Sequence, residues 1–233
     1  WGAGDYDDLC YHRSLPKHSD EVSWLGAFRD WFYSAPGGVK VFKETVFLMK
    51  LRWLNLYLPG VQLIYLSRHP LGIISSYKKS ALFTAWNYQE KYQVLKSEVF
   101  EHPELHRYRY IFGLIEEQKW VQCLLAMILV RRGELLLHLP NFRHHVLSYE
   151  GLCQETEREV ARLFDFMKME FPQSVRKEIR HRCSAFRGGT YSTYRETSKA
   201  PFGWAQVLNG QEKWEIEQIL LEVDENESLQ RAA

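Results

Sequence analysis

The chain has 233 residues, of which 45% are hydrophobic and 25% are charged, and its formal net charge is +1. This length and composition are typical of a globular chain with a sizeable core, so we predict one domain over residues 1–233. The low net charge excludes a general electrostatic attraction for nucleic acid, and the longest unbroken apolar run, 123–130, is far shorter than the roughly 20 residues of a membrane span.

The first quarter of the chain predicts two helices with a short strand between them. After an irregular opening segment, residues 19–21 cap a helix that ends at Pro36-Gly37-Gly38. Residues 39–42 form a short strand candidate. A helical pattern follows over 47–58.

The clearest strand in the sequence covers residues 61–66. It is rich in β-branched and other apolar residues, so we expect it to be buried on both faces. A helix then begins at Pro70, which is favoured in a first helical turn, and extends to about Leu82.

The second half of the chain predicts helices around one further strand, 144–149. The expected helices cover 88–99, 105–132, 156–167, 174–183 and 211–223. Because strands alternate with helices, the pattern predicts an α/β fold with a parallel sheet flanked by helices.

The residues with the clearest chemistry lie at the junction between strand 61–66 and the helix from Pro70. The strand carries Arg68 to the carboxyl edge of the sheet, where open α/β folds bind ligands. The helix N-terminus favours an anion, and Ser76 follows Arg68 by eight residues. A guanidinium and a hydroxyl are suited to a phosphate group, although the same residues could simply cap a sheet edge and fill a helix contact.

This segment resembles the 3′-phosphate-binding motif of sulfotransferases that use 3′-phosphoadenosine 5′-phosphosulfate (PAPS). That motif is a strand, Arg-Asp-Pro, and a helix with Ser eight residues after the Arg. The resemblance assigns the 3′-phosphate contacts to Arg68 and Ser76, with His69 in place of the usual Asp. It implies the P-loop-NTPase-like sulfotransferase fold, PAPS as co-substrate and no metal.

Later segments resemble the same family, chiefly its carbohydrate-type and bacterial branch, in order and spacing. Residues 146–152 resemble its strand followed by Tyr-Glu-Asp-Leu, where Tyr149 and Glu150 are expected to be mainly structural. Residues 190–208 resemble a loop that folds over the nucleotide. The resemblance makes Thr193 and Arg195 candidate phosphate or adenine contacts.

Two candidate catalytic residues follow the strand 39–42. Lys43 and Glu44 resemble a strand end beside the acceptor pocket in several branches of the family. Lys43 would lie near the transferring group, and Glu44 would take the proton of a hydroxyl or amine acceptor, either a small molecule or a carbohydrate. An exposed ion pair at a strand end is the alternative for Glu44.

The family's first strand and its Gly-rich turn, which hold the 5′-phosphosulfate, are absent from these residues. The chain contains no Gly-Lys pair, and Arg187-Gly188-Gly189-Thr190 follows a charged helix rather than a buried strand. Since residues 1–4 resemble the stretch after the family's first helix, we expect the turn to lie upstream of Trp1. The 233 residues alone should then bind nucleotide without transferring sulfate at a useful rate.

The sequence is also compatible with other functions and with two cellular compartments. The alternatives are a nucleotide-binding or interaction module without catalysis, a P-loop kinase and a structural α/β module. The kinase is disfavoured because no acidic Mg²⁺ ligand follows strand 61–66. Four scattered cysteines favour free thiols in a cytoplasmic protein, the alternative being the Golgi lumen if a membrane anchor precedes Trp1.

Overall fold

A computed structural model describes most of the chain after residue 57. The described residues are 30, 34, 41, 51, 54–55, 58–79, 88–115, 119–184 and 197–232. Apart from residues 30, 34 and 41, the predicted helix from residue 19 and the strand 39–42 lie outside them, as does most of the helical pattern 47–58. So do four of the six candidate site residues, namely Lys43, Glu44, Thr193 and Arg195.

The described residues divide into two compact units, and each is presented by itself. The first unit holds the described residues up to 62, together with 88–143 and 223–232. The second unit holds 63–79, 144–184 and 197–222. The sequence predicted one domain, and this division does not test that prediction.

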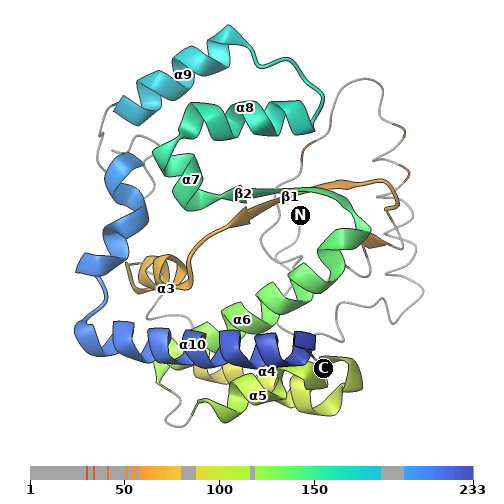
Figure 1. Ribbon diagram of the computed structural model, residues 1–233, viewed down its shortest axis with the longest axis vertical. Coiled ribbons are helices and arrows are strands. Elements are labelled where there is room, and N and C mark those ends of the chain that lie inside the picture. The colour runs from red at the N-terminus through yellow and green to blue at the C-terminus, as the bar shows by residue number, and fades with distance from the viewer. Residues whose placement is uncertain are drawn as a thin grey trace. The chain divides into compact units, whose positions relative to one another are not determined.

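The second unit contains a small parallel sheet of two described strands, β1 (Gln62–Ser67) and β2 (Arg143–Ser148), of which only the first residues fall in the first unit. Figure 1 shows the two strands side by side. Four helices of this unit follow the strands in sequence. They are α3 (Pro70–Lys79), α7 (Tyr149–Gln154), α8 (Thr156–Phe166) and α9 (Gln173–Ser184). The described chain is therefore mostly helical with a general α/β character, as predicted, around a smaller sheet than expected.

Strand β1 differs from its prediction in burial. Residues 62, 64 and 66 are exposed, whereas the residues between them are half-buried. Ile64 and Leu66 keep 40% and 52% of their surface accessible. A strand in a sheet of only two described strands has fewer neighbours than a central strand of a layered sheet, so the expectation of burial on both faces was wrong.

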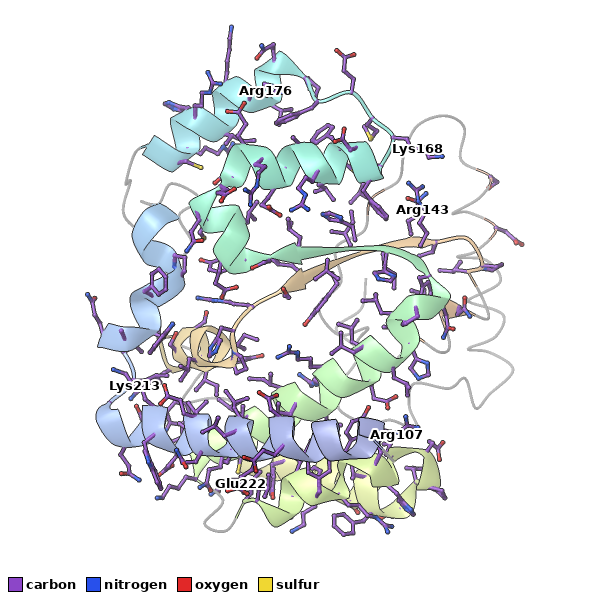
Figure 2. The ribbon with its side chains drawn as sticks, viewed as in Figure 1. Arg107, Arg143, Lys168, Arg176, Lys213 and Glu222 are labelled. Carbon is purple, nitrogen blue, oxygen red and sulfur yellow. The ribbon has the colours of Figure 1, made fainter. Side chains whose placement is uncertain are left out.

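Helices α8 and α9 are joined by charged side chains. Arg176 of α9, labelled in Figure 2, donates to Glu157 of α8 at 2.7 Å, and Arg180 donates to the same carboxylate at 3.2 Å. These two guanidinium groups lower the pKa of Glu157, with the hydrogen bond from Arg180 as the largest cause. The helical stripe predicted over 156–167 therefore forms a helix that is tied to its neighbour by exposed ion pairs.

The end of the second unit is fixed by a capping box at the start of α10 (Gly210–Ala232). The Asn209 side chain accepts the Glu212 N–H at 2.9 Å, and the Glu212 carboxylate accepts the Asn209 N–H at 2.8 Å. Lys78, in the last turn of α3, donates to both oxygens of Glu212 at 2.7 Å. The same carboxylate thus joins the end of α3 to the start of α10.

The first unit is helical where it is described. It contains α4 (Tyr88–Glu101), η3 (Pro103–Tyr108), α5 (Arg109–Gly113), α6 (Trp120–His138) and η4 (Leu139–Asn141). The prediction of one helix over 105–132 was wrong. The chain instead forms a 3₁₀ turn that starts at Pro103 and a short helix that ends at Gly113, a residue that weakens a helix.

Helix α6 carries a polar cluster inside the first unit. Tyr108 hydrogen-bonds to Glu134, whose side chain is 4% exposed, and Glu134 lies 3.5 Å from Nε2 of His138. Gly133 allows this arrangement, because a Cβ there would lie 2.5 Å from Cε1 of the Tyr108 ring. Burial and the neighbouring Glu134 carboxylate raise the pKa of Tyr108 above its ordinary value.

None of the described helices is long and apolar enough to cross a membrane.

Candidate functional site

The candidate site lies at the junction of β1 and α3, where the sequence predicted an anion site. Arg68 follows the last residue of β1, and its side chain is half-buried. Within the described part of the chain, its guanidinium makes no hydrogen bond and no ion pair, and Nε is a buried atom without an acceptor. Buried polar groups are normally paired, so an unpaired guanidinium here is suited to an external anion.

The guanidinium of Arg68 is held in place by two neighbours. Its Cζ lies 4.3 Å from the centroid of the Tyr149 ring, which begins α7. On the α3 side, a Cβ built on Gly72 would lie 2.7 Å from Nε, so the Arg68 side chain packs where Gly72 has no side chain of its own. Arg68 is therefore sandwiched between an aromatic ring and the backbone of α3.

This position places Arg68 and Ser76 on one face of α3. Gly72 and Ser76 are four residues apart in the helix, and residues at that spacing are neighbours about 5–6 Å apart on one face. Ser76 is exposed, and its hydroxyl has no hydrogen-bond partner within the described residues. Its buried neighbour Ser75 bonds instead to the Gly72 carbonyl at 3.0 Å. Arg68 thus packs against Gly72, and Ser76 lies one helical turn further along the same face of α3.

The first turn of α7 fixes the main chain beside Arg68. One oxygen of Glu150 accepts the His69 N–H at 3.0 Å, and the other accepts the Ser148 hydroxyl at 3.2 Å. Ser148 in turn accepts the Gly151 N–H at 3.2 Å and so caps α7. Because both oxygens of Glu150 are occupied in this way, the carboxylate serves the junction rather than pairing with Arg68.

His69 caps α3 through its side chain. Its Nδ1 accepts the Leu71 N–H at 3.2 Å, as a capping Asp or Asn oxygen would do. The Ile73 N–H bonds to the His69 carbonyl at 3.1 Å, and Pro70 has no N–H. The helix N-terminus therefore offers fewer free N–H groups than the sequence suggested, and among the described residues the N–H of Gly72 remains for an anion.

The 3₁₀ segment η5 (Thr197–Gln206) packs against α3 and α7 beside this junction. The ring of Trp204 is stacked on that of His69 with centroids 6.5 Å apart. Lys213, labelled in Figure 2 near the start of α10, donates to the Ala205 carbonyl at 2.7 Å. Trp204 of η5 therefore lies beside the junction, whereas Thr193 and Arg195 lie outside the described residues, so that the loop predicted over the nucleotide stays a prediction.

The described cysteines of the chain are free thiols, and one of them lies in the junction. Cys153 of α7 lies nearby, and burial raises the pKa of its thiol, although Tyr149 and Arg68 act in the opposite direction. Three cysteines are described, and Cys123, Cys153 and Cys183 are all free thiols. Among the described residues no group of three or more His, Cys, Asp or Glu side chains could hold a metal ion.

Two residues of the junction have roles that the sequence did not indicate. Tyr149 was expected to be mainly structural, yet it covers the guanidinium of Arg68. Gly72 was not among the candidate residues, although its place four residues after Arg68 is compatible with a close approach of the two. Tyr149 also begins a helix rather than ending the strand 144–149, because Ser148 caps α7 at that point.

Comparison with known proteins found no matching protein family, no matching curated protein and no matching solved structure.

Proposed function

We propose that the β1–α3 junction binds the 3′-phosphate of an adenosine nucleotide and that the protein is a sulfotransferase using PAPS. The observation that carries this proposal is the Arg68 guanidinium, which is half-buried, sandwiched and without an acceptor among the described residues. The hydroxyl of Ser76 lies on the same face of α3 and supports the same ligand. Together they match the two phosphate contacts of the motif that this segment resembles.

The kinds of donor at the junction favour a phosphate over a carboxylate or a halide. Arg68 offers a fork of N–H donors that fits two phosphate oxygens, and Ser76 offers one further donor about one helical turn beyond Gly72. A phosphate monoester has three terminal oxygens and can accept from both residues together. The ligand expected from the resemblance, a ribose 3′-phosphate, has this form.

The reaction that the proposal assigns is transfer of a sulfuryl group. The acceptor oxygen or nitrogen forms a bond to sulfur while the bond between sulfur and the 5′-phosphate oxygen breaks. A base takes the acceptor proton, and adenosine 3′,5′-bisphosphate leaves. Glu44 as base and Lys43 beside the transferring group remain part of the proposal, as does the sulfotransferase fold.

The experiment that tests nucleotide binding is calorimetry with adenosine 3′,5′-bisphosphate and with AMP. The bisphosphate should bind more tightly, because only it carries the 3′-phosphate. Arg68→Ala should weaken its binding by about 2–4 kcal/mol, since a charge-assisted contact is lost in a half-buried site. Ser76→Ala should cost about 1 kcal/mol, the value of one neutral hydrogen bond.

A matched control is Arg182→Ala on α9, which removes the same charge from an arginine that pairs with Glu178. Its affinity should equal that of the unchanged chain. Equal binding of AMP and the bisphosphate, or full affinity in folded Arg68→Ala, would contradict the proposal. Transfer from radiolabelled PAPS to pooled hydroxyl and amine acceptors, with upstream residues added, separates a sulfotransferase from a module that only binds the nucleotide.

A further inference from the structure

Two free thiols of the second unit lie close to each other where α7, α8 and α9 meet. Cys183, in the last turn of α9, donates from its sulfur to Oγ1 of Thr156 at 3.6 Å. That hydroxyl donates to the carbonyl of Leu152 at 2.6 Å, and Leu152 is the residue before Cys153 in α7. Burial raises the pKa of the Cys153 thiol, and the neighbouring Cys183 raises it further. The contacts and the electrostatics therefore place the two cysteines next to each other.

The two thiols differ in their access to solvent. Cys153 is only 9% exposed, whereas Cys183 is half-buried. The thiolate is the reactive form of a cysteine, and burial keeps Cys153 in the thiol form. Cys183 also lies at the end of a helix, where local rearrangement costs least. Cys183 is therefore suited to react first with an oxidant from solution, and Cys153 to react second.

Cys153 is connected to the candidate site through Tyr149. The Tyr149 hydroxyl is hydrogen-bonded to the Cys153 sulfur, and the ring of the same tyrosine lies 4.3 Å from Cζ of Arg68. Arg68 is itself close enough to Cys153 to act on the pKa of that thiol. A change at the Cys153 sulfur therefore affects the side chain that holds the Arg68 guanidinium.

We propose that Cys153 and Cys183 form a redox-sensitive site, which a small-molecule disulfide such as oxidised glutathione converts into an internal disulfide that weakens anion binding at Arg68. The effect on anion binding rests on the proposed function, whereas formation of the disulfide does not. The new bond draws the Cys153 sulfur away from the Tyr149 hydroxyl. The ring is then held less firmly over Arg68, and the guanidinium is less well placed for its ligand.

The oxidation proceeds in two exchange steps. The Cys183 thiolate attacks one sulfur of oxidised glutathione, whose S–S bond breaks, and one reduced glutathione leaves. The Cys153 thiolate then attacks the sulfur of Cys183, and the second glutathione leaves. The two protein thiols lose two electrons and two protons, and one molecule of oxidised glutathione gains them. Because the two sulfur atoms must come within about 2.05 Å, the Cys183 side chain turns away from Thr156.

The first test identifies the disulfide. The full chain is incubated with oxidised glutathione and digested without reductant, and the peptides are analysed by mass spectrometry. The expected product joins Cys153 to Cys183 and is reversed by dithiothreitol. In Cys153→Ser, glutathione should remain on Cys183, because the second step is lost. Cys123→Ser is the matched control, since it removes a buried thiol from α6 and should leave the same product. Glutathione that stays on Cys183 of the unchanged chain would overturn the inference.

The second test measures the effect on the candidate site by calorimetry with adenosine 3′,5′-bisphosphate. Oxidation should weaken binding to the unchanged chain about fivefold, which corresponds to one neutral hydrogen bond, and should have no effect on Cys183→Ser. If the disulfide forms but the affinity is the same, the regulation is wrong while the proposed function stands. If the reduced chain does not bind the bisphosphate, the proposed function fails and the regulation with it, whereas mass spectrometry still decides whether the disulfide forms.

Discussion

Two side chains of this protein lie against a helix where glycine leaves room, and they differ in what they do with their polar atoms. In the first unit, Tyr108 packs on Gly133, and its hydroxyl donates a hydrogen bond to Glu134, which in turn lies beside His138. In the second unit, Arg68 packs on Gly72, and its guanidinium donates a hydrogen bond to no acceptor among the described residues. The first arrangement completes its own hydrogen bonds. The second leaves a guanidinium without an acceptor among the described residues, which is why we propose a ligand there.

The Tyr108 position is expected to contribute to stability, and the Arg68 position to ligand binding. A buried tyrosine whose hydroxyl is satisfied contributes to folding, and nothing about it requires a partner. A half-buried arginine without an acceptor carries a desolvation cost that an anion would offset. We therefore expect changes at the Tyr108 position to affect folding and changes at the Arg68 position to affect ligand affinity.

The largest expected effect is that of Gly133→Ala on stability. Its Cβ would lie 2.5 Å from a carbon of the Tyr108 ring, which is rigid and buried, so the ring or the helix must shift. We expect a loss of about 2 kcal/mol in the free energy of unfolding, measured with denaturant. Gly113→Ala is the matched control, because no atom lies within 4 Å of its added Cβ. Equal stability of the two variants would remove the assigned role of Gly133.

Gly72→Ala should affect binding instead. Its Cβ would lie 2.7 Å from Nε of Arg68, and a flexible side chain can move away at little cost to the fold. Stability should be unchanged or higher by up to about 1 kcal/mol, because Ala favours helix. The displaced guanidinium should weaken binding of adenosine 3′,5′-bisphosphate about tenfold, or about 1.4 kcal/mol. Gly210→Ala, which meets no atom within 4 Å, should bind normally in the same titration.

The smallest effect is expected at alkaline pH in the first unit. Burial raises the pKa of Tyr92 to about 12 and that of Cys123 to about 11, from ordinary values of 10.0 and 9.0. Both groups are held neutral in the folded state, so stability is fully present below about pH 9 and is lost as the pH rises toward the folded values. Circular dichroism during a base titration measures this loss.

The substitution Tyr92→Phe tests how much the Tyr92 hydroxyl contributes to this alkaline loss of stability. The Tyr92 hydroxyl is buried and has no hydrogen-bond partner among the described residues. Its removal should leave stability at pH 7 unchanged or raise it by up to about 1 kcal/mol, and should move the alkaline transition to higher pH. A clear loss of stability at pH 7 would indicate that the hydroxyl has a partner in solution.

Periodicity predicted several elements of this fold to within a few residues. The apolar run 61–66 and the helix start at Pro70 correspond to β1 and α3, and the stripe over 156–167 corresponds to α8. These elements are encoded by neighbouring residues, which is why the pattern was sufficient. The prediction of one helix over 105–132 was wrong. The hydrophobic pattern continues past Gly113, but the helix that begins at Arg109 ends at this glycine.

The candidate site was predicted only at the residues that a motif names. Arg68 and Ser76 were named from the motif that this segment resembles, and their role as site residues stays a prediction. The structure shows Arg68 against Gly72 of α3, with Ser76 four residues further along that helix. The contacts that hold Arg68 come from Tyr149, 81 residues later in the chain, and no local pattern encodes such a contact. The capping role of His69 was also missed, because a histidine is not among the usual capping residues.

The sandwich of Arg68 between Tyr149 and Gly72 has a consequence for the entropy of binding. A free arginine side chain loses up to about 2 kcal/mol of conformational freedom when it is fixed on a ligand. Here the ring and the helix backbone restrict the rotamers of the side chain before any ligand arrives. Much of that loss has then already occurred during folding, so more of the favourable enthalpy of the proposed guanidinium–phosphate contact would be retained as affinity.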